Sequence, residues 1–87
     1  MKIKSGYILR KVADSNVVVA VGARAKEFNG IINLTETSAL AWKMLEKGSD
    51  KAKIVDALLS EYDVERAVVE KDVDQFLQKI TEAGLVE

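Results

Sequence analysis

The stretch GIINLTET at residues 30–37 marks the point where the spacing of apolar residues changes along this chain. Before it, apolar residues tend to alternate, which is typical of strands, and after it they recur at helical spacing. Thr35 is the predicted N-cap of the following helix, and Glu36 would lie in its first turn, where a negative charge suits the helix dipole. The stretch therefore predicts a short strand at residues 30–34 that leads directly into a capped helix.

The residues before this stretch predict two further strands. Residues 6–13 form the first, and residues 17–21, which are β-branched at four of five positions, form the second. The polar cluster at 14–16 predicts the turn that joins them. Residues 22–29 are less regular and allow a helical turn before the third strand. Together the three strands predict an antiparallel meander whose outer strands have open edges.

Three helices are predicted after this stretch. The first ends near Gly48, where a left-handed residue is wanted, and Ser49 and Asp50 open the second. Asp63 is the predicted cap of the third and longest helix, which ends at Gly84 so that the last residues fold back onto the core. The apolar residues at helical spacing are Ala39, Leu40, Ala41, Trp42, Met44 and Leu45, then Ile54, Val55, Leu58, Leu59 and Tyr62, then Val69, Val73, Phe76, Leu77 and Ile80. The sequence thus predicts an α+β fold, a three-stranded antiparallel sheet followed by three helices, in a single domain at residues 1–87.

The overall composition restricts the class of partner. Apolar residues make up 48% of the chain and charged residues 31%, which is typical of a globular domain. The net charge of −1 gives no general attraction to nucleic acid or to an anionic membrane, and no apolar run is long enough to span a membrane. We therefore expect a cytoplasmic protein that is a monomer or a weak homodimer. Four basic residues near the first strand, interpreted as a solubilising edge, are Lys2, Lys4, Arg10 and Lys11.

The chain offers few groups for catalysis. It contains neither histidine nor cysteine, on which most nucleophile–base arrangements depend. Asp72 and Asp74 are two residues apart, as are Asp63 and Glu65, and helical residues at this spacing do not face each other. No EF-hand spacing and no glycine-rich phosphate loop occurs. We therefore expect a protein that is not an enzyme and that has no metal site and no cofactor.

Binding to DNA is an alternative of a different class. A small sheet with three helices is typical of winged helix-turn-helix domains, in which a recognition helix presents positive side chains to DNA. The candidate helix at residues 65–83 carries three positive and five negative residues, a net charge of −2, so the phosphate backbone would repel it. A DNA-binding regulator and a structural accessory subunit of a larger enzyme stay as alternatives.

Several segments resemble one known family along nearly the whole chain. The matching segments are YILR at 7–10, NLTET at 33–37 leading to Ala41 and Trp42, LLSEYDV at 58–64, DVxxFL at 72–77 and AGLV at 83–86. Each segment is weakly specific alone, but their order and spacing together resemble the PqqD-like family. Members of this family are recognition elements for ribosomally synthesised, post-translationally modified peptides. One departure is Thr35, where members often carry Asn, and both residues are good N-caps.

The resemblance implies a non-catalytic function. It implies three antiparallel strands followed by three helices, as in a winged helix-turn-helix domain. It also implies that the protein binds the leader segment of a precursor peptide and presents it to a modifying enzyme, often a radical SAM protein. The leader would add as a further strand beside the third strand and lie against the third helix. The resemblance therefore assigns the third strand's open edge to a peptide.

Transferred to this sequence, the resemblance gives a candidate peptide-binding site. The residues of this site are Asn29, Gly30, Ile31, Ile32, Asn33, Leu34, Val68, Asp72, Gln75 and Lys79. Val68 would meet an apolar leader residue, while Asp72 and Lys79 would select charges. An alternative role for Asp72 is a hydrogen bond to neighbouring backbone. The second choice is the opposite flank of the helix, formed by Lys71, Asp74 and Gln78.

Overall fold

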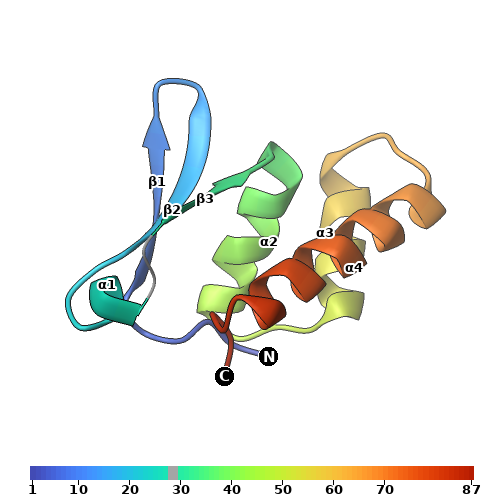
Figure 1. Ribbon diagram of the computed structural model, residues 1–87. Coiled ribbons are helices and arrows are strands. Elements are labelled where there is room, and N and C mark those ends of the chain that lie inside the picture. Colours follow the sequence, from blue (N-terminus) through green and yellow to red (C-terminus); the bar gives the residue numbers. More distant parts are fainter. Residues whose placement is uncertain (28–29) are drawn as a thin grey trace.

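The computed structural model describes residues 1–27 and 30–87 (Figure 1). Its elements in chain order are β1 (Tyr7–Val12), β2 (Ser15–Ala20), α1 (Arg24–Glu27), β3 (Ile31–Leu34), α2 (Glu36–Glu46), α3 (Lys51–Glu61) and α4 (Arg66–Glu82). The predicted α+β fold is confirmed, with three antiparallel strands in one sheet and the three long helices after it. The helical turn that residues 22–29 allow is present as the short helix α1 between β2 and β3.

The sheet has the order β1-β2-β3, so β1 and β3 are the outer strands of its described part. In the register, Leu9 pairs with Val18, and Val18 pairs with Ile32 on the other side. The predicted turn at 14–16 is wrong in position. Because Val12 pairs with Ser15, only residues 13–14 connect β1 to β2, and the left-handed position is taken by Ala13 with a φ of 55°.

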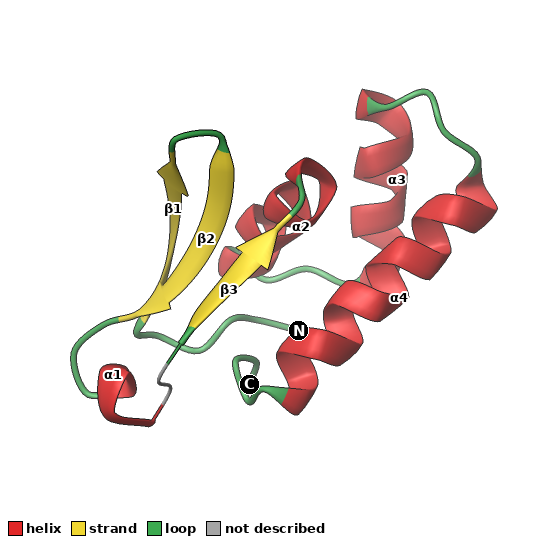
Figure 2. Cartoon of the chain, turned by 45° about the horizontal axis from the view of Figure 1, so that its top comes forward, coloured by secondary structure: helices red, strands yellow, loops and turns green. Residues whose placement is uncertain are grey.

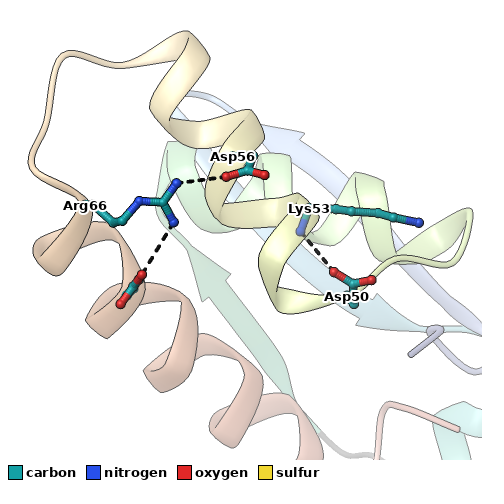
Figure 3. A network of polar contacts seen from close by, with 5 residues as sticks. Asp50, Lys53, Asp56 and Arg66 are labelled. Atoms are coloured by element: carbon teal, nitrogen blue, oxygen red, sulfur yellow. Dashed lines mark hydrogen bonds and ion pairs between the residues drawn. The ribbon is translucent and has the colours of Figure 1, made fainter.

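The predicted cap at Thr35 is confirmed, and of the two residues predicted to open α3, Asp50 is the N-cap. Thr35 caps α2 by accepting a hydrogen bond from the amide of Ser38 at 3.2 Å. Asp50 caps α3 in the same way, accepting from the amide of Lys53 at 2.9 Å (Figure 3). The prediction for Asp63 is wrong, because α4 begins later and its N-cap is Glu65, which makes no side-chain capping bond. The carboxylate of Asp63 therefore lies outside the first turn.

The start of α4 is tied to α3 by Arg66 instead (Figure 3). Its guanidinium donates to Asp56 Oδ1 on α3 at 3.0 Å and to Glu70 Oε1, one turn along α4, at 3.5 Å. The hydrogen bond to Asp56 is the main cause that raises the pKa of Arg66 above its ordinary value. This exposed pair links the start of α4 to α3, at a helix end where no side chain makes a capping bond.

The hydrophobic core lies between one face of the sheet and the helices. Trp42, Leu45, Ile54, Ile80 and Leu85 are fully buried in it, and the sheet contributes buried residues from β2 and β3. Trp42 and Phe76 are core residues, as predicted. Tyr62 was predicted on the buried stripe of α3, but it follows the last turn and is 36% exposed.

The two ends of the chain meet and close the core. Ile3 forms an antiparallel bridge with Val86, and the amide of Lys4 donates to the carbonyl of Leu85 at 2.9 Å. The predicted return of the last residues onto the core is therefore confirmed, since Leu85 is fully buried. Within the described ranges, no helix has the length and apolar character needed to cross a membrane.

Candidate functional site: a groove between strand β3 and helix α4

Strand β3 is bonded to β2 through alternate residues. In an antiparallel pair, residues alternate between positions that bond to the neighbouring strand and positions whose backbone groups point away from it. The amide of Val21 donates to the carbonyl of Gly6 at 2.8 Å, and the register carries this alternation across the sheet. Ile32 and Leu34 consequently direct their backbone groups toward β2, and both side chains are buried.

The other two residues of β3 face the open edge. Ile31 and Asn33 direct their N–H and C=O groups away from β2, and both side chains are exposed. Figure 2 shows α4 on the open side of β3, with β2 on the other side. Ile32 and Leu34, which are among the predicted site residues, instead have their backbone groups directed toward β2. Asn29, also predicted at this edge, lies outside the described residues.

A groove of about 310 Å³ separates the end of β3 from α4. Its walls come from β3, from the start of α2 and from one face of α4. The lining residues are Asn33, Leu34, Thr35, Thr37, Ser38, Asp72, Gln75, Phe76 and Lys79. Asp72, Gln75 and Lys79 follow each other at spacings of three and four on α4, so they form one stripe along the groove. An open strand edge and a polar helix face thus border the same hollow.

The structure brings together half of the residues predicted for the site. Asn33, Leu34, Asp72, Gln75 and Lys79 all line the groove. The other described residues of that prediction do not line the groove. They are Gly30, directly before β3, Ile31 at the start of β3, the buried Ile32, and Val68 near the start of α4. Ile31 is 63% exposed and Val68 is 51% exposed, so both are apolar side chains in contact with solvent. Val68 is not among the described residues that line the groove.

The second-choice flank of α4 is engaged elsewhere. Asp74 forms an ion pair of 2.8 Å with Lys51 at the start of α3, and Gln78 donates to Glu82 one turn along α4. Lys71 is exposed. None of these three residues lines the groove described above. The flank that carries Gln75 is therefore the one that borders β3.

Four lining residues were missed as site residues. Thr35, Thr37 and Ser38 place hydroxyl groups at one end of the groove, where Thr35 Oγ1 lies 3.0 Å from Thr37 Oγ1 and 3.1 Å from Ser38 Oγ. Phe76 supplies an aromatic side chain that is 5% exposed. The sequence did carry a signal for the hydroxyls, because a capped helix that directly follows an edge strand must begin beside that edge.

Asp72 and Lys79 place two charges of opposite sign in the groove. Neither Asp72 nor Lys79 forms an ion pair with its side chain anywhere in residues 1–27 and 30–87. The alternative role of Asp72, a hydrogen bond from its carboxylate to neighbouring backbone, is absent from the same ranges. Both side chains are exposed, so their charges are solvated. The described residues contain no cluster of acidic side chains that could hold a metal ion.

Comparison with known proteins agrees with this architecture. The profile of the family described as Coenzyme PQQ synthesis protein D (PqqD) matches residues 8–86. This chain belongs to the PqqD family. The match covers both the β half and the α half, including β3, α2 and α4. No curated protein matches the chain.

Two solved structures share the fold. One is described as "TbiB1 in Complex with the TbiA(beta) Leader Peptide"; it is 29% identical, with a TM-score of 0.77, and the match covers all of this chain and 95% of the other. The second is described as "Lasso peptide synthetase B1 complexed with the leader peptide"; it is 24% identical, with a TM-score of 0.73, and the match covers 97% of this chain and 93% of the other. The second likeness shows the fold alone.

Proposed function

We propose that this protein binds the leader segment of a ribosomally made precursor peptide in the groove between β3 and α4. The leader adds as a further strand to β3 and pairs with the outward backbone groups of Ile31 and Asn33. Its side chains on the α4 side meet Asp72, Gln75 and Lys79. Backbone pairing supplies affinity that does not depend on the leader's sequence, and the helix stripe supplies selectivity.

One observation carries this proposal. The outward backbone groups of β3, those of Ile31 and Asn33, point into the space that α4 borders with three polar side chains. An added strand would satisfy those groups and would place alternate side chains against the helix. TbiB1, a protein of the same fold and 29% identical, has been solved with a leader peptide. That likeness supports a peptide as the occupant.

The proposed role is non-catalytic and depends on a second protein. The chain has no histidine or cysteine, and the groove holds carboxylate, amide, amine and hydroxyl groups without a nucleophile–base pair. The bound leader is presented to a maturation enzyme in the cytoplasm, where the precursor is made. Family resemblance makes a radical SAM protein the first enzyme to test.

A titration of the isotope-labelled protein with the precursor encoded beside its gene tests the proposal. We expect micromolar or tighter binding, about −8 kcal/mol, from a small interface. The amide shifts should concentrate on β3 and on the turns of α4 that carry Asp72, Gln75 and Lys79. Absence of binding contradicts the proposal. Shifts on the flank of Lys71 and Gln78 contradict the placement, and salt-sensitive binding of duplex DNA instead would favour a regulator.

A further inference from the structure

A second cleft lies at the opposite edge of the sheet. It has a volume of about 400 Å³ and opens between the end of the β1–β2 hairpin, α2 and the end of α3. In Figure 1, β1 is on the far side of β2 from β3, so this cleft and the groove beside α4 do not share an edge strand. Its apolar floor is formed by Leu9, Ala39, Leu40 and Tyr62. Tyr62 is the residue that left the predicted buried stripe of α3.

Charged residues surround this floor. Arg10, Lys11 and Lys43 are the positive residues that line the cleft, and Glu36 and Glu61 are the negative ones. Lys11 Nζ and Glu36 Oε1 are 3.7 Å apart, with both side chains at least 60% exposed, so this pair is weak and can exchange partners. The side chains of Arg10 and Lys43 form no ion pair in the described ranges.

The backbone of β1 is open along this cleft. The same alternation that governs β3 makes Ile8 and Arg10 bond to β2 and leaves the N–H and C=O groups of Leu9 and Lys11 pointing outward. Leu9 packs against the core, so its side chain lies on the helix side of the sheet. Arg10 is on the other face, and its side chain is exposed. A strand added at this edge would place some side chains beside Leu9, on the helix side of the sheet, and others beside Arg10, on the opposite face.

We infer that the β1 edge and its cleft bind an extended acidic segment of a second protein, independently of the occupant of the β3 groove. Cross-strand pairing specifies the segment: an apolar residue opposite Leu9, where it reaches Leu40 and Tyr62, and acidic residues opposite Arg10 and Lys11. The segment's backbone satisfies the outward groups of β1. The two edges of the sheet then hold two different extended chains.

A second copy of this chain does not suit the same edge. Pairing two β1 strands brings Arg10 and Lys11 of both copies onto one short ribbon, where like charges oppose pairing. Positive residues at an edge strand are a common way to prevent such self-association. An acidic strand would instead be attracted to Arg10 and Lys11, because its charges are opposite to theirs. The basic cluster of the sequence thus gains a role in selecting a partner.

The test uses two synthetic peptides and the full chain. The first is acetyl-Thr-Val-Glu-Glu-Phe-Val-Thr-amide, whose residues match β1 in an antiparallel register, and the second replaces both glutamates with lysine. In titrations of the isotope-labelled chain, the acidic peptide should shift the amides of Leu9 and Lys11 and those beside Leu40 and Tyr62. The basic peptide should bind about tenfold more weakly, because two attractive cross-strand pairs become repulsive.

Charge reversal provides the matched control. The double variant Arg10→Glu with Lys11→Glu reverses the charge of both residues that face the peptide's glutamates and should reverse the preference between the two peptides, while Lys47→Glu with Lys53→Glu changes the net charge equally and should preserve it. Equal binding of both peptides, no shift up to their solubility limit, or shifts confined to β3 and α4 would overturn the inference. Shifts that depend on the concentration of the chain alone would assign the edge to a second copy and overturn it as well.

Discussion

Asn33 joins both parts of the proposed site at one position. Its backbone groups point out of the sheet, and the residue also lines the groove beside α4. Its neighbour Ile32 is the opposite case, since its backbone bonds to β2 and its side chain is 7% exposed. Because adjacent residues of a strand alternate in direction, the backbone of Ile32 holds the sheet together, whereas the backbone of Asn33 is directed toward the proposed ligand.

Replacing Asn33 with proline tests this separation. Asn33→Pro removes an outward N–H without breaking the ladder to β2, so the protein should fold and bind its precursor about five- to tenfold more weakly, as loss of one hydrogen bond predicts. Calorimetry measures the affinity. Asn33→Ala is the control, because it keeps the N–H and removes only the side chain. Ile32→Pro should instead reduce stability, since it removes a bond within the sheet; a folded Ile32→Pro variant of unchanged stability would contradict the derived alternation.

Gln75 and Gln78 lie on different flanks of α4, and only Gln75 lines the groove. A tryptophan at position 75 would fill space that the leader needs. Gln75→Trp should weaken precursor binding at least about tenfold, equivalent to about 1.4 kcal/mol, whereas Gln78→Trp should leave the affinity within about twofold. Competition with a fluorescent leader peptide measures both variants. The reverse order of effects would move the site to the flank of Lys71 and Asp74.

The starts of the three long helices differ in how well the sequence predicts them. Thr35 and Asp50 each bond to an amide three residues further on, which is a local interaction that the sequence predicts well. Asp63 is the same type of residue as Asp50 but lies two residues before the N-cap of α4, which is Glu65. The presence of a capping residue type therefore did not specify where α4 begins.

The two aspartates give a direct comparison of stability. Asp50→Ala should lower the free energy of unfolding by about 1 kcal/mol, because the amide of Lys53 loses its partner. Asp63→Ala should change it by less than about 0.5 kcal/mol, as for other surface positions. Guanidinium unfolding followed by the emission of Trp42, the single and fully buried tryptophan, measures both values. An equal loss in the two variants would restore Asp63 as a cap.

Whole-molecule features depend on contacts between the ends of the chain. Leu85 is fully buried, and the backbone bonds between residues 1–4 and 85–87 hold it under the helices. In a chain of this size, total stability is only about 5–15 kcal/mol, so one core contact at the terminus is a large fraction of it. The last residues are therefore part of the hydrophobic core.

Leu85→Ala tests this contribution. The change should lower the free energy of unfolding by about 2–5 kcal/mol, because it leaves a cavity in a packed core. Val86→Ala is the control: its side chain is only partly buried, and its bridge to Ile3 uses backbone groups, so the loss should be smaller. Thermal unfolding followed by circular dichroism measures the two variants. Equal stability of Leu85→Ala and the unmodified chain would show that the terminus does not close the core.

The sequence predicts different parts of the fold and of the candidate sites to different extents. Apolar spacing and helix caps predicted the strands, the three long helices and the return of Leu85, since these are patterns of local periodicity. The position of the first turn depended on the register between Val12 and Ser15, which no local signal specifies. The stripe of Asp72, Gln75 and Lys79 was predicted by helical spacing together with the family resemblance. The second cleft required the end of α3 to lie beside β1, which only the assembled fold shows.

Residue-resolved hydrogen exchange of β3 tests the central proposal most directly. In the free protein, the amides of Ile32 and Leu34 should exchange slowly and those of Ile31 and Asn33 rapidly, because only the first pair is bonded to β2. A saturating amount of the precursor should slow the exchange of Ile31 and Asn33 strongly and leave the other two little changed. If the amides of Ile31 and Asn33 exchange as fast with the precursor bound as without it, the leader does not add as a strand to β3.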